Sequence, residues 1–186
     1  MRTIGIIVLL WITVNTYAPK PAPYDMEEVK RIEELIIKRM KEKNFNRFLD
    51  ALALQESSNN PQAYNKYGYL GKYQLGRSAR KSTGYEHVTY HKFVTNPDIW
   101  PEDEQDIAMR KLIMKNTAHL AVIINQHDST CVKGNMITKS GILAAAHLAG
   151  AGGVKKFFSS NGRYNPSDAY GTHLSDYLIE YSGYNF

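Results

Sequence analysis

Apolar residues recur at helical spacing along most of this chain, and that periodicity constrains the fold more than any other feature of the sequence. The periodic runs predict helices over 26–42, over a second segment that restarts at Asn44, and over 101–125, 137–149 and 168–181. The piece 61–76 contains Gly68, Gly71 and Gly76, so no long regular element is expected there. The fold class that follows is mostly α, and a chain of 186 residues is expected to form one main domain.

The first residues have the layout of a secretory signal. In residues 1–18 one positive charge at Arg2 precedes an apolar run, and small Ala18 stands at the end. The run is shorter than the ~20 apolar residues that a transmembrane helix needs. Pro19 is a poor fit for signal cleavage, so the segment is predicted either to be removed or to stay as an N-terminal anchor. Either way, we expect an exported protein, periplasmic or secreted.

Three divisions are predicted after this signal. Residues 19–25 form a proline-rich spacer, which cannot join a helix or a sheet ladder. Residues 26–43 form an amphipathic helix that precedes the domain, with Asp25 as its N-cap. Residues 44–186 form the domain itself.

The chain has 1 cysteine, Cys131, in a segment that is expected to be a loop, "HDSTCVKGN". A disulfide within the chain is therefore impossible, and the core alone must hold the domain together. A catalytic thiol needs a paired histidine, and His127 is near only in sequence. A structural or incidental cysteine is the favoured interpretation.

The formal charge of +5 favours acidic partners such as nucleic acid, anionic lipid or an anionic polysaccharide. The densest basic run, "KRMKEK" at 38–43, is interrupted by Met40 and Glu42, so a solvated helix face is favoured over a DNA-binding arm. Nucleic acid is therefore not the expected partner. No metal-binding spacing, phosphate-binding loop or nucleophile elbow is present, and no cofactor is expected.

One acid remains as a candidate for chemistry, Glu56, which stands where an apolar helix gives way to a glycine-rich segment. It follows Leu52 by four residues, so it lies on or beside the apolar face of that helix. Burial disfavours the charged carboxylate and would raise its pKa, which would suit a general acid for glycoside cleavage. On spacing alone, a solvated residue at a helix end is the better interpretation.

The run "ESSNNPQAYNKYGYLGKYQL" resembles the lytic transglycosylase and goose-type lysozyme superfamily, whose motif is roughly E-S-x-x-x-P-x-A-x-S-x-x-G-A-x-G-L-M-Q-I. The ungapped matches are Glu56, Ser57, Pro61, Ala63, Gly68, Gly71 and Gln74. Asn65 replaces the preferred Ser, and Lys72-Tyr73 replaces Leu-Met. A second motif, A-Y-N-A-G-x-G, resembles "AHLAGAG" at 146–152, and a Tyr-Val pair resembles Tyr177-Leu178. The resemblance covers the chain from about residue 44 to its end.

The resemblance implies a mostly α, lysozyme-like single domain (α+β with little β) with a cleft for peptidoglycan glycan strands. In it, Glu56 would protonate the oxygen between N-acetylmuramic acid and N-acetylglucosamine, and Ser57 would steady the site. The implied substrate-binding residues are Ser57, Tyr73, Gln74, His147 and Tyr177. Helix capping by Ser57 and core packing by Tyr177 are nearly equal alternatives. His147-Leu148 replaces the family's Tyr-Asn, and Leu148 cannot donate a hydrogen bond.

A lytic transglycosylase needs no second carboxylate, because the 6-hydroxyl of the sugar closes an anhydro ring. A hydrolytic muramidase does need one. The possible second acids surround a helix start, where the helix dipole explains them: Asp98, Glu102, Asp103, Glu104 and Asp106. The transglycosylase is therefore favoured, with hydrolysis or a non-catalytic peptidoglycan-binding or assembly protein as alternatives. We expect a monomer, and an envelope-spanning assembly stays open as a partner.

Overall fold

The computed structural model describes residues 25–132 and 134–186. The predicted signal at 1–18 and all but the last residue of the predicted spacer lie outside these ranges. The described elements are mostly helices, which confirms the predicted fold class at that level. In chain order they are α2 (Met26–Ser57), α3 (Arg77–Thr83), α4 (Tyr90–Thr95), the 3-10 helix η1 (Pro97–Ile99), α5 (Glu102–His119), α6 (Ala121–His127), β1 (Thr130–Val132), β2 (Asn135–Ile137), α7 (Lys139–Ser159) and α8 (Leu174–Glu180).

Helix α2 is one continuous helix, so the predicted restart at Asn44 is wrong. The Asn44 side chain caps nothing, and it instead donates to the carbonyl of Asn185 at 3.0 Å. Asp25 does act at the start of the helix, because its Oδ1 accepts the backbone N–H of Glu27 at 2.9 Å. The chain separates into two compact units, Met1–Lys38 and Arg39–Phe186, and the boundary falls inside α2.

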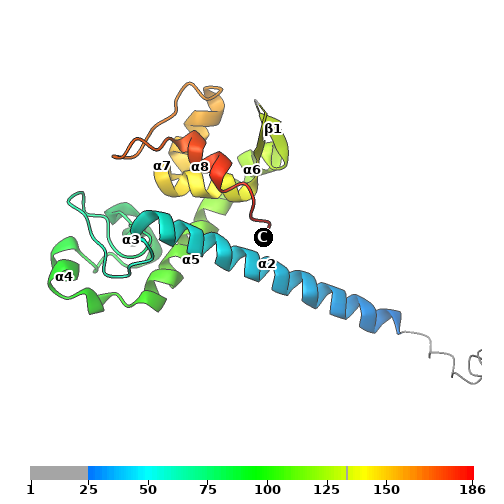
Figure 1. Cartoon of the computed structure of the whole chain (residues 1–186), viewed down its shortest axis with the longest axis horizontal. Coiled ribbons are helices and arrows are strands. Elements are labelled where there is room, and N and C mark those ends of the chain that lie inside the picture. The colour runs from blue at the N-terminus through cyan, green and yellow to red at the C-terminus, as the bar shows by residue number, and fades with distance from the viewer. Residues whose placement is uncertain (1–24, 133) are drawn as a thin grey trace, which may run out of the picture. The chain divides into compact units, whose positions relative to one another are not determined.

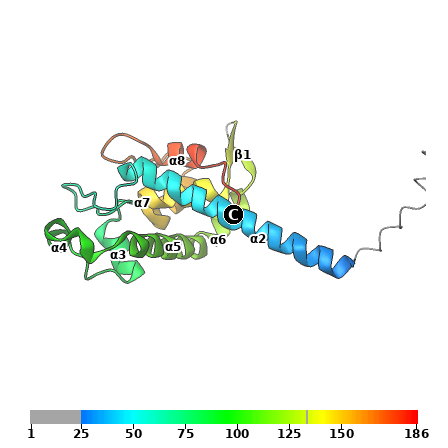
Figure 2. The same cartoon turned by 60° about the horizontal axis from the view of Figure 1, so that its bottom comes forward.

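The second unit contains the hydrophobic core. The C-terminal part of α2 contributes its buried face, Phe48, Leu49, Leu52 and Ala53. In Figures 1 and 2 this part of α2 passes between α7 and α8 on one side and α3 and α5 on the other. Helices α7 and α8 pack closely, since a Cβ added to Gly141 in α7 would lie 2.2 Å from the backbone oxygen of Leu178 in α8.

The glycine-rich piece 61–76 is irregular, as predicted, with isolated bridges that pair Leu70 with Tyr64 and with Leu75. Gln105 of α5 holds it in place. Its Oε1 accepts the backbone N–H of Lys72 at 2.7 Å, and its Nε2 donates to the carbonyls of Pro61 and Trp100. A Cβ at Gly71 would lie 2.3 Å from Gln105 Oε1, and φ at this position is +76°, so both the close approach and the backbone favour glycine.

The remaining elements differ from prediction in their boundaries. The expected helix over 101–125 is two helices, because the chain leaves helical geometry at Leu120 (φ −107°, ψ 9°). The expected loop around Cys131 contains the antiparallel hairpin of β1 and β2. Helix α7 continues beyond 149 to Ser159 after a kink at Gly150 (φ 69°). Within the described ranges, no helix combines the length and apolar character needed to cross a membrane.

Candidate functional site

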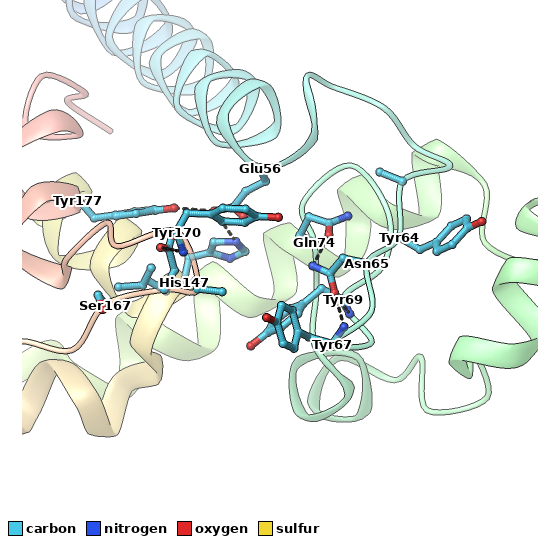
Figure 3. A pocket seen from close by; sticks show the side chains of 14 residues that line it. Glu56, Tyr64, Asn65, Tyr67, Tyr69, Gln74, His147, Ser167, Tyr170 and Tyr177 are labelled. Atoms are coloured by element: carbon cyan, nitrogen blue, oxygen red, sulfur yellow. Dashed lines mark hydrogen bonds and ion pairs between the residues drawn. The ribbon is translucent and has the colours of Figure 1, made fainter.

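Glu56, at the C-terminal end of α2, lies in a cavity of about 580 Å³, the Glu56 cavity. Its walls come from the end of α2, the segment 63–74, helices α7 and α8, and the segment 167–170. The lining residues are Glu56, Ala63, Tyr64, Asn65, Tyr67, Tyr69, Gln74, His147, Leu148, Ser167, Asp168, Ala169, Tyr170 and Tyr177. Figure 3 shows Tyr177 and His147 on one side of Glu56 and Gln74 on the other.

One carboxylate oxygen of Glu56 is held by two neighbours. The phenol of Tyr177 donates to Oε1 at 2.8 Å, and Nε2 of His147 lies 3.4 Å from the same atom. Oε2 has no hydrogen-bond partner among residues 25–132 and 134–186. The side chain of Glu56 keeps 18% of its surface exposed, so Oε2 is the atom that can meet a ligand.

The protonation state of Glu56 corrects the prediction from burial. Burial alone raises the pKa of this carboxyl. The charge of Asp168 also raises it. The hydrogen bond and charge of His147, together with the hydrogen bond from Tyr177, lower the pKa and outweigh both, so the net pKa of Glu56 is lowered. Without a ligand, Glu56 is therefore ionised near neutral pH.

Tyr177 is a buried phenol that serves as a permanent donor. Burial first, and then the charge and hydrogen bond of Glu56, raise its pKa far above that of an ordinary tyrosine, so the hydroxyl stays protonated. Its ring stacks on Tyr181 with ring centroids 5.6 Å apart. Core packing and contact with the acid are thus both true of this residue.

His147 is almost covered, with 6% of its side chain exposed. Its Nε2 must act as the donor toward Glu56, because a carboxylate only accepts hydrogen bonds. Its Nδ1 is buried and has no hydrogen-bond partner among the described residues. The imidazole therefore contributes to the cavity mainly through the nitrogen that faces Glu56.

Gln74 faces the cavity from a strained position, with φ at +46°. Its side-chain Nε2 donates to the carbonyl of Gly71 at 2.9 Å, and its Oε1 accepts from Asn65 Nδ2 at 3.0 Å. This pairing fixes the orientation of both amides and leaves one N–H of each for other partners. Asn65, which the sequence marked only as a departure from the family pattern, is thus part of the wall.

Two predicted site residues lie outside this cavity. Tyr73 is only 2% exposed, and its hydroxyl donates to Asp106 at 2.8 Å. It offers no ring face to a sugar, which corrects that prediction. The hydroxyl of Ser57 accepts the backbone N–H of Asn60 at 2.9 Å and lies 2.8 Å from the carbonyl of Lys72. Ser57 therefore joins the helix end to the glycine-rich piece beside Glu56.

Lys72, in the same glycine-rich piece, is buried and pairs with acids of α5. Its side chain is 6% exposed and forms ion pairs with Glu102 at 2.9 Å and Asp106 at 3.0 Å. Glu104 accepts a hydrogen bond from Tyr85. None of the five acids proposed from sequence as a second carboxylate lines the Glu56 cavity.

Asp168 is the second carboxylate of the Glu56 cavity, and it was not among the site residues predicted from sequence. Its Oδ1 accepts the backbone N–H groups of Tyr170 at 2.8 Å and Thr172 at 3.0 Å, so the side chain is fixed by its own turn. Its Oδ2 has no hydrogen-bond partner within the described part of the chain. The turn residues "NPSDAYGT" were the available signal, because Asp commonly bonds backbone N–H groups just after it.

Four tyrosines of the cavity wall were not among the predicted site residues. The exposed fractions are 51% for Tyr64, 59% for Tyr67, 45% for Tyr69 and 87% for Tyr170. Rings with an apolar face and a polar tip suit the surface of a pyranose sugar.

No group of three or more His, Cys, Asp or Glu side chains within the described ranges could hold a metal ion. Comparisons with protein-family models, with curated proteins and with solved structures each found no match to this chain.

Proposed function

We propose that this protein cleaves the β-1,4 bond between N-acetylmuramic acid and N-acetylglucosamine in peptidoglycan, with Glu56 as acid and then base. One observation carries the proposal. Glu56 and Gln74 of the first motif, His147 of the second and Tyr177 of the third line one cavity, although they are far apart in sequence. The resemblance selected these residues from the sequence alone.

The favoured reaction is that of a lytic transglycosylase. Glu56 gives its proton to the leaving bridge oxygen as the bond from that oxygen to the anomeric carbon breaks. The 6-hydroxyl of the same muramic residue then bonds to the anomeric carbon and returns its proton to Glu56. The enzyme ends the cycle in its starting state, so one carboxyl that alternates between two protonation states is enough.

The geometry of Glu56 suits this alternation. Tyr177 and His147 hold Oε1 and stabilise the ionised form, which is the form required after the first proton transfer. The protonated form is the scarcer one at neutral pH because the pKa is lowered. The rate of bond cleavage is therefore expected to rise as the pH falls.

Hydrolysis is a second candidate, and Asp168 is the observation that favours it. A fixed second carboxylate in the same cavity can orient or deprotonate a water, which a transglycosylase does not need. A non-catalytic glycan-binding or assembly protein is the third alternative, and it gives no function to the anchored acid.

The test is to incubate the purified protein with peptidoglycan and to weigh the released fragments by mass spectrometry. A transglycosylase gives fragments lighter by one water than hydrolytic ones. Fragments of hydrolytic mass would assign the reaction to Asp168-assisted hydrolysis instead. Absence of any fragment would reject the proposal that the protein cleaves peptidoglycan.

The variant Glu56→Gln should abolish cleavage, because the amide cannot transfer the proton. Glu33→Gln, on the exposed N-terminal part of α2, is the matched control and should cleave normally. Circular dichroism of both variants should match wild type. Normal cleavage by the Glu56→Gln variant would show that Glu56 is not the catalytic acid.

A further inference from the structure

A second cavity of about 450 Å³, the Arg80 cavity, adjoins the first. Its lining residues are Tyr67, Gly68, Arg77, Arg80, Glu86, Val88, Thr89 and Tyr90. Tyr67 also lines the Glu56 cavity, so the two cavities are neighbours at this residue. A branch of a ligand in the Glu56 cavity would have to pass Tyr67 to reach the Arg80 cavity.

Arg80 is buried, with 3% of its surface exposed, and is not fully paired. Its Nε donates to the carbonyl of Val88 at 3.0 Å, and its Nη1 donates to the carbonyls of Gly68 and Leu75. Its Nη2 has no hydrogen-bond partner among residues 25–132 and 134–186. Two of its five N–H groups are therefore left for a ligand.

No carboxylate in the described ranges forms an ion pair with Arg80. Glu86 lines the same cavity, but its carboxylate pairs with Lys81 at 3.1 Å. Arg77 adds a second guanidinium to the wall, and its side chain has no hydrogen bond or ion pair within the described part of the chain. Burial and the charge of Arg77 lower the pKa of Arg80, the direction expected for a cation without a counter-ion.

A buried cation without a counter-ion is costly, and an anion that enters the cavity recovers part of that cost. Guanidinium groups match planar carboxylates with paired N–H donors. We propose that the Arg80 cavity binds a carboxylate on a branch of the ligand whose main chain occupies the Glu56 cavity. The inference rests on the proposed function, since the peptide branches of peptidoglycan carry such carboxylates.

The test measures binding, so that it does not depend on turnover. Glu56→Gln is titrated by calorimetry with a short peptidoglycan glycan whose peptide branches carry free carboxylates. The same glycan with those carboxylates converted to amides is the second probe. The free-carboxylate glycan should bind about fivefold more tightly, which is the upper range for a partly exposed ion pair. Added salt should shrink the difference.

The substitution Arg77→Gln, made in the same background, should weaken this preference, because it removes one of the two guanidinium groups of the cavity wall. Arg80 itself is a poor choice for substitution, because it holds three backbone carbonyls around the glycine-rich piece. Arg47→Gln is the matched control. Arg47 is exposed on α2, lines neither cavity and brings the same change of charge.

The outcomes separate the two proposals. A preference for the free carboxylate that is unchanged in Arg47→Gln and smaller in Arg77→Gln supports the anion site. Equal binding of both glycans, or a preference of unchanged size in Arg77→Gln, overturns the anion site alone. If neither glycan binds, the proposed function and the anion site both fail.

Discussion

At the scale of single residues, opposing forces on Glu56 decide its resting charge. Burial favours the neutral acid, whereas His147 and Tyr177 favour the carboxylate. The two residues outweigh burial, so the pKa of Glu56 is lowered. The charge of Asp168 works in the opposite direction. The neighbours of Glu56 therefore set the pH at which the acid form becomes available.

Replacement of His147 by Gln should move the basic limb of the pH–rate profile to higher pH. His147 lowers the pKa of Glu56, so its loss raises that pKa, and the protonated acid persists further into the neutral range. The measurement is kcat/KM for peptidoglycan cleavage across the acidic and neutral range. His119→Gln, at the exposed end of α5, is the control and should leave the profile in place. A shift to lower pH would refute this account of His147.

Asp168→Asn should move the same limb in the opposite direction. The charge of Asp168 raises the pKa of Glu56, so the neutral amide lets that pKa fall further. The product masses give a second readout. If hydrolysis contributes, its fragments should decline in this variant while anhydro fragments remain. Unchanged products together with an unchanged pH limb would show that Asp168 serves only its own turn.

The sequence predicted the cavity residues that a motif could mark. Glu56, Gln74, His147 and Tyr177 were named from the resemblance, and all line the cavity. The prediction for Tyr73 was wrong because the motif marks only a position along the chain. The ring is buried, and its hydroxyl donates to Asp106. Asp168 belongs to a turn whose distance from Glu56 depends on how the segments meet in space, which local patterns do not contain.

At the scale of elements, the contact between α7 and α8 positions Tyr177. Gly141→Ala would place a methyl group 2.2 Å from the backbone oxygen of Leu178, and a backbone atom cannot rotate away. We expect a loss of unfolding free energy of about 2 kcal/mol, measured by denaturant titration, and lower cleavage because α8 shifts with Tyr177. Retained stability and full activity would show that the two helices separate at little cost.

Gly152→Ala is the matched control in the same helix. No atom lies within 4 Å of its added Cβ. Alanine is a better helix former, so stability should hold or rise by about 0.5–1 kcal/mol. The pair of variants thus separates close packing from helix propensity.

Helical periodicity predicted the existence of most elements better than their ends. It wrongly separated a helix at Asn44, because an asparagine inside a helix looks like a cap unless its tertiary partner is known. Gly150, just past the predicted helix end at 149, does interrupt regular geometry, yet α7 continues beyond it. The strands β1 and β2 are three residues each, too short for an alternating pattern to identify.

At the scale of the whole molecule, the chain is expected to tolerate removal of its first unit. No described residue before Arg39 is buried, and the first buried residue of α2 is Phe48. A chain that starts at Arg39 should keep the circular dichroism spectrum of the second unit. Its unfolding free energy should change by less than about 1 kcal/mol. A large drop in melting temperature would show that the first unit supports the core.

In the intact chain, several apolar side chains of the N-terminal part of α2 are exposed to solvent, including Leu35 at 59% and Met40 at 59%. The predicted export of the protein and the fate of residues 1–18 stay predictions, because they fall on residues outside the described ranges.

The hydrogen bond between Glu56 and Tyr177 can form only after the chain has been synthesised as far as α8. Its partners are 121 residues apart, and a ribosome that adds roughly 5–20 residues per second needs about 6–24 s to synthesise that stretch. During that interval a nascent chain exposes the carboxylate without its phenol anchor. Proteolytic fragments that end before α8 share this defect. The anchored acid is thus a property of the finished polypeptide, so newly made chains pass through a latent period before the carboxylate is held in place.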